Sequence, residues 1–91
     1  MESLQKTSTR VLQSLLATQP TTPGKVRFAW RIAAGPALGR AGTTEWSEDG
    51  TLRVRARDDA WLREMRRARP IILERLTQLL GANVVRKFLL E

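Results

Sequence analysis

The first apolar residues of the chain recur at helical spacing. Five of them fall close to one helical face, with serine and threonine elsewhere: Leu4, Val11, Leu12, Leu15 and Leu16. This pattern predicts a short amphipathic helix in residues 1–17. Residues 18–24 then combine two prolines, a glycine and three threonines, and such a composition cannot sustain a helix. The sequence therefore predicts a linker at 18–24, followed by a folded domain at 25–91.

A second helix is predicted from Lys25 to Ala34, in an alanine-rich stretch. The residues that repeat there at helical spacing are Val26, Ala29, Trp30 and Ala33. Gly35 and Pro36 should kink or restart this helix, which we expect to end near Leu38.

The next residues predict a β-hairpin. Thr43, Thr44 and Trp46 favour a strand, and residues 48–50 (Glu-Asp-Gly) are a turn signal between two extended runs. Along the second strand, apolar residues alternate strictly with arginines: Leu52, Val54 and Ala56 with Arg53, Arg55 and Arg57. One face of that strand should be buried while the other carries three guanidinium groups.

Helical spacing resumes after the hairpin. Asp58 or Asp59 should supply the N-cap of a helix that ends at a break around Arg69 and Pro70. Without that break, Arg69 would lie in the middle of the apolar helix face. A further helix should run from Pro70 until glycine stops it at position 81, and a closing strand is expected within residues 84–90.

The predicted order of elements is helix, strand, strand, helix, helix, strand, preceded by the N-terminal helix. A strand–helix–helix–strand unit should join parallel neighbours by a crossover, which places both helices on one face of a three-stranded sheet. The fold class is therefore α+β. This order is found in type II KH domains, which bind nucleic acid.

Charge narrows the range of functions. The 91-residue chain has a net charge of +7 and a pI near 11.5, which favours a polyanionic partner. It contains no cysteine and no histidine, and it lacks a nucleophile with an adjacent base, a phosphate-binding glycine loop and a metal-ligand pattern. We expect a protein that is not an enzyme and has no cofactor, metal or small-molecule substrate. No segment resembles a membrane span or a secretory signal, so we expect a cytoplasmic location.

Two groups of arginines are candidates for binding a polyanion. The first is Arg53, Arg55 and Arg57, whose side chains should lie roughly 6–7 Å apart along one sheet face. The second surrounds the predicted helix break and consists of Arg63, Arg66, Arg67 and Arg69. Arg40 should join either group. Each group could also be an ordinary solvated surface that prevents aggregation.

The three tryptophans are candidates for stacking on unpaired bases. Trp30 and Trp61 fall on apolar helix faces and should belong to the core. The face that Trp46 occupies depends on a strand register that the sequence does not fix, although we favour the core.

Residues 30–91 resemble the DciA family of bacterial replicative-helicase loaders. The features that carry the resemblance, in order, are Trp30, Gly35-Pro36, Gly50-Thr51-Leu52-Arg53-Val54, Asp59-Ala60-Trp61, Arg69-Pro70, Leu73 with Leu76, Gly81 and Val84-Val85-Arg86. This resemblance implies a KH-like fold, binding to DNA and partnership with the replicative helicase in DNA replication. True KH domains clamp the nucleic-acid backbone with a Gly-x-x-Gly loop, but residues 66–69 here are Arg-Arg-Ala-Arg, so contacts should come from arginine side chains.

Two other functions stay open. The chain could be an adaptor that docks on an acidic protein partner, with the N-terminal amphipathic helix as the feature that favours this function. It could also be an RNA-binding KH-like factor. The sequence does not decide between single-stranded DNA, duplex DNA and RNA.

Overall fold

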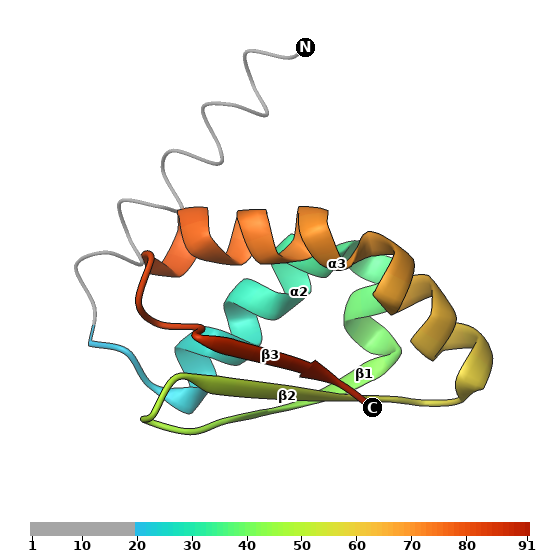
Figure 1. Ribbon diagram of the computed structural model, residues 1–91, viewed down its shortest axis with the longest axis horizontal. Helices are drawn as coiled ribbons and strands as arrows, with labels where there is room; N and C mark the ends of the chain where they lie inside the picture. The colour runs from blue at the N-terminus through green and yellow to red at the C-terminus, as the bar shows by residue number, and fades with distance from the viewer. Residues whose placement is uncertain (1–19) are drawn as a thin grey trace, which may run out of the picture.

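The computed structural model describes residues 20–91 (Figure 1). Its elements are α2 (Pro23–Arg40), β1 (Gly42–Trp46), β2 (Thr51–Ala56), α3 (Asp59–Leu80) and β3 (Lys87–Leu90). The predicted N-terminal helix at 1–17 and the first two residues of the predicted linker lie outside the described residues.

The three strands form one mixed sheet in the order β1-β2-β3. β1 pairs with β2 in antiparallel register, and β2 pairs with β3 in parallel register. Both helices lie on the same side of this sheet (Figure 1), where Leu52 and Val54 of β2 are buried. The α+β prediction is confirmed, and the helix-strand-strand-helix-strand order is compatible with a KH-like fold.

Helix α2 begins two residues earlier than predicted, at Pro23. The Thr22 hydroxyl accepts a hydrogen bond from the Lys25 amide at 3.1 Å, and proline at the first helical position loses nothing, because its N–H would have no partner there. The predicted kink is present at Gly35, whose φ of 86° lies in the region that favours glycine. Pro36 follows and disfavours helical geometry in the residue before it.

The predicted break into two helices around Pro70 is wrong, because α3 continues through this residue as one helix. Asp58 is its N-cap and accepts a hydrogen bond from the Trp61 amide at 2.9 Å. Pro70 cannot donate to the carbonyl one turn earlier, but it lies on the exposed side, where water can serve that carbonyl. The helix therefore changes direction about halfway along its length (Figure 1) without ending.

The core lies between the helices and the sheet. Its largest fully buried side chains are Trp30, Leu52, Met65, Ile72, Leu76, Val26 and Val54. Phe88 of β3 meets Trp30 edge to face, with ring centroids 6.3 Å apart. Trp30 is a core residue as predicted, and Trp61 is half-buried against the core.

The closing strand is shorter than expected, because Val84 and Val85 precede it in a loop. Trp46 contacts that loop and holds it against the sheet. It lies on the core side of β1, is half-buried, and donates a hydrogen bond from its indole Nε1 to the Val84 carbonyl at 3.0 Å. The favoured core position of Trp46 is therefore confirmed.

Gly42 marks a point where the chain must come close to its neighbours. A Cβ atom at this position would lie 2.7 Å from Cγ1 of Val54 and 3.0 Å from Cε of Met65. Gly42→Ala should therefore reduce the free energy of unfolding by about 1–3 kcal/mol, as measured by urea denaturation. Gly24→Ala is the control, since its Cβ would meet no atom closer than 3.9 Å. Equal stability of the two variants would contradict the packing described for β1.

Candidate nucleic-acid interface

The basic residues are distributed unevenly among the elements. Helix α2 carries Lys25, Arg27, Arg31 and Arg40 and no acidic residue. Helix α3 carries five arginines against three acidic residues. In the rest of the described chain, five basic and five acidic residues balance. The excess positive charge of the described domain therefore lies on the helices, above all on α2.

The predicted arginine face of β2 exists, but its charge is partly neutralised. Arg53 is half-exposed, and its Nε lies 2.7 Å from a Glu91 carboxylate oxygen, as a close ion pair without a directional hydrogen bond. The other Glu91 oxygen is 3.7 Å from Nε of Arg55. Glu45 lies opposite Arg53 in the β1–β2 register. This sheet face thus carries mixed charge, with the exposed side chain of Leu89 beside it.

Arg57 is separated from the other two arginines of its group. Its Nη2 donates a hydrogen bond to the backbone carbonyl of Arg40 at 3.3 Å, at the end of α2. Arg57 therefore lies with the basic residues of α2, against the backbone of Arg40.

All four arginines predicted around the helix break are exposed, and three of them make no hydrogen bond to another element within residues 20–91: Arg63, Arg66 and Arg67. Arg67 lies 3.3 Å from Glu64, one turn earlier, but both side chains are more than half exposed, so this pair stabilises little. Arg63 and Arg66 have no ion-pair partner within residues 20–91. These arginines remain candidates for binding an anion.

Arg69 has a structural contact instead. Its guanidinium carbon lies 5.1 Å from the centroid of the Phe88 ring, and its Nη1 donates to the Phe88 carbonyl at 2.6 Å. That carbonyl lies on the outer edge of β3, because the ladder bonds to β2 involve the alternate residues Lys87 and Glu91. Arg69 is compatible with the apolar helix face because β3 supplies its partners, and no helix break is needed.

Arg75, which the sequence analysis did not single out, has a similar structural contact. The kink at Gly35 interrupts the helical bonding of the carbonyls just before it. Arg75 donates from Nη1 to one of them, the carbonyl of the buried residue Ala33, at 3.0 Å. This contact ties α3 to the bend of α2.

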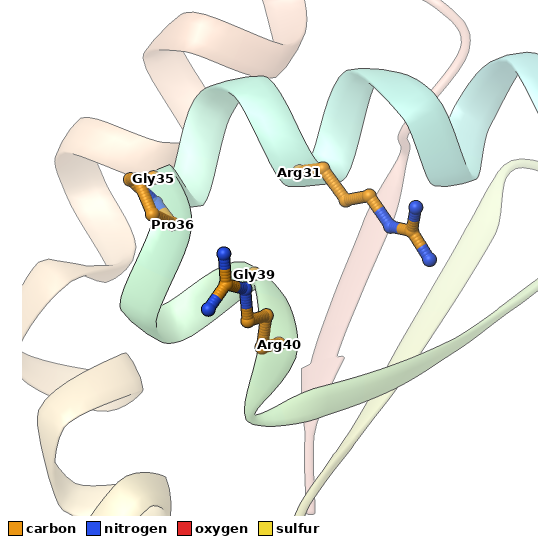
Figure 2. Close-up of a pocket in the computed structure, with 5 residues that line it drawn as sticks. All are labelled: Arg31, Gly35, Pro36, Gly39 and Arg40. Atoms are coloured by element: carbon orange, nitrogen blue, oxygen red, sulfur yellow. The ribbon is translucent and has the colours of Figure 1, made fainter.

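Two neighbouring hollows lie along α2 and share Arg31. One, of about 260 Å³, is lined by Gly24, Arg27, Phe28 and Arg31. The other, of about 330 Å³, is lined by Arg31, Gly35, Pro36, Gly39 and Arg40. In Figure 2 the Arg40 side chain reaches back toward Gly35 and Pro36, whereas the Arg31 side chain extends the other way, along the earlier part of the helix. Neither guanidinium forms an ion pair within residues 20–91. We call the two hollows together the α2 trough.

Arg27 and Arg31 were absent from the sequence-based candidates. The helical pattern of α2 drew attention to its buried side, and a lone arginine on an exposed side is unremarkable. The signal that could have identified them is the complete absence of acidic residues from Pro23 to Arg40.

Asp49, at the hairpin turn, has a conformational role. Asp49 accepts a hydrogen bond from the Thr51 amide at 3.0 Å. Hydrogen bonds from Thr51, aided by Lys87 and Arg86, hold the pKa of Asp49 below its usual value. Among residues 20–91, no group of three or more acidic, histidine or cysteine side chains is placed to hold a metal ion. None of the helices described is long and apolar enough to cross a membrane.

Arg69 contacts β3 and Arg66 does not, so the two arginines should contribute differently to the free energy of unfolding. Arg69→Met keeps the apolar stem but removes the cation over Phe88 and the donor to its carbonyl, so it should lower the free energy of unfolding by about 1–3 kcal/mol. Arg66→Met, at an exposed position three residues earlier, should change stability by less than about 0.5 kcal/mol. Thermal or urea denaturation of both variants measures the difference, and a stable Arg69→Met variant would refute the structural role.

Comparison with known proteins agrees with the resemblance seen in the sequence. A family model described as "Dna[CI] antecedent, DciA" matches residues 3–88. No curated protein and no solved structure matches the chain. Because the family match spans nearly the whole sequence, the chain belongs to the DciA family, which has a helicase-loader role in replication.

Proposed function

We propose that this domain binds DNA through arginine side chains on its helices while it acts with the replicative helicase. The single observation that carries the proposal is the charge of α2, which holds four basic residues and no acidic one. Such an element attracts a polyanion, because no carboxylate of its own competes for the guanidinium groups.

Arg63, Arg66 and Arg67 of helix α3 should supply further phosphate contacts, because all three are exposed. The sheet-face residues Arg53 and Arg55 should contribute less, because binding a phosphate there must compete with Glu91. Arg57 should behave as part of the α2 group, since it lies against the Arg40 carbonyl. Arg69 should contribute mainly to folding.

This arrangement fits a loader better than an enzyme. Guanidinium groups on an open surface hold a strand by its phosphates, and such contacts form and dissolve without any chemical step. The family is of the loader type and is not a known catalytic one. Reversible attachment is what placing a helicase on DNA requires.

Salt dependence and matched arginine variants test the proposal. Binding of labelled single-stranded DNA, measured by fluorescence anisotropy, should weaken steeply as salt rises. Replacing Arg27, Arg31 and Arg40 together by serine should make the log–log salt slope shallower by about 2, since each lost phosphate contact removes about 0.7. Replacing Arg53 and Arg55 by serine, the sheet variant, should have a smaller effect for each arginine removed, because Glu91 already lies beside both.

A larger loss in the sheet variant would instead identify the β2 face as the DNA surface. Wild-type binding that does not respond to salt would contradict the proposal as a whole. Circular dichroism of each variant confirms that the fold is retained.

The protein-adaptor alternative makes a separate prediction. If contact with the helicase does not depend on DNA, the full chain should co-purify with replicative helicase after nuclease treatment, and the Arg27/Arg31/Arg40 serine variant should do so equally well. Loss of helicase binding in that variant, with DNA binding intact, would assign the α2 arginines to the protein partner.

A further inference from the structure

Phe28 is an aromatic side chain on the solvent side of a folded domain. The described residues include three exposed large apolar side chains, Phe28 at 48%, Ile71 at 54% and Leu89 at 38%. Phe28 alone of these is aromatic. Val26, two positions earlier, and Ala29, the next residue, are fully buried, so the ring lies off the core face of α2.

The space beside the ring is open. Phe28 lines the smaller hollow of the α2 trough together with Gly24, Arg27 and Arg31. Gly24 lies one turn before Phe28, and even an added Cβ there would meet nothing closer than 3.9 Å. A flat group can therefore approach the ring from this side.

The surroundings of the ring are cationic. Arg27 precedes Phe28 and Arg31 follows it by three positions, so the two arginines are one helical turn apart, about 5–6 Å between their Cβ atoms. No carboxylate on α2 offsets them. The trough continues past Arg31 to Arg40, where Gly35 and Gly39 bring no side chain into the space.

An aromatic ring beside two cations in one hollow matches the chemistry of a nucleic-acid strand, in which each base is flanked by phosphates. We propose that an unpaired base of a single strand stacks on Phe28 while Arg27 and Arg31 bind the phosphates on either side. The inference rests on the proposed DNA binding and makes it more specific: in a duplex both faces of a base are covered by its neighbours, so Phe28 should select unpaired strands.

The test uses the full chain and two oligonucleotides with the same number of phosphates. One is oligothymidine and the other is an abasic strand of equal length, which has no bases to stack. At fixed salt, wild-type protein should bind the thymidine strand roughly 5- to 100-fold more tightly than the abasic one. Phe28→Ala should remove most of that preference, and Phe28→Trp should preserve or increase it.

Ile71→Ala is the matched control, because it shortens another exposed apolar side chain outside the trough. It should leave the preference unchanged. The salt slope separates the two kinds of contact: Phe28→Ala should leave it unaltered, whereas replacing Arg27 and Arg31 by serine should make it shallower. A matched RNA strand shows whether the stacked base can come from either nucleic acid.

The outcomes distinguish the two proposals. Failure of wild-type protein to bind any oligonucleotide would overturn the proposed DNA binding. Equal affinity for thymidine, abasic and duplex DNA would leave DNA binding in place and overturn the stacking role of Phe28. Loss of helicase co-purification in Phe28→Ala, with the base preference intact, would likewise overturn stacking and assign the ring to the protein partner.

Discussion

Phe88 is the residue at which the elements of this domain meet. Its ring lies edge-on to Trp30 of α2 and under the guanidinium of Arg69 from α3, while its backbone is in register with Leu52 of β2. Because β3 is short and lies at the sheet edge, it depends on these contacts for its place. Among the arginines, Arg69 is the one that these contacts engage.

The arginines divide according to whether the fold supplies an acceptor. Arg69 and Arg75 donate to backbone carbonyls on the edge of β3 and at the bend of α2, and Arg53 and Arg55 face Glu91. Arg69 and Arg75 stabilise the domain, and the carboxylate of Glu91 partly neutralises Arg53 and Arg55. Net charge alone would count all of them as potential phosphate ligands. The excess that remains lies on the two helices: α2 has no acidic residue of its own, and among the α3 arginines Arg67 lies near Glu64, in a pair that is more than half exposed.

Features of the fold that depend on local interactions could be predicted from the sequence, whereas features that depend on contacts between distant residues could not. The hairpin and the buried face of β2 were predictable because strict alternation is a local property. The kink at Gly35 was predictable for the same reason, since glycine and proline act on their own backbone. The continuity of α3 was not, because it depends on the exposure of Pro70 and on a partner for Arg69 nineteen residues away.

The candidate site was predicted less well than the fold. Alternating arginines suggested the β2 face, but Glu91 lies beside it only because β3 is parallel to β2. Arg27, Arg31 and Phe28 gave no periodic signal of their own, since periodicity identifies the buried side of a helix and leaves its outer side unspecified. What would have singled them out is the absence of acidic residues over α2, which is a property of composition within one element.

The bend of α2 bears on the kind of strand that the trough suits. Gly35 divides the helix, and Arg31 and Arg40 extend in different directions on the two sides of the bend (Figure 2). A duplex presents its phosphates along a stiff, regular path, so it would have to deform to follow cations arranged in this way. A single strand can turn at each nucleotide and meet the two arginines in succession. On the proposed DNA-binding role, the bend of α2 and the exposed ring of Phe28 both suit an unpaired strand better than a duplex.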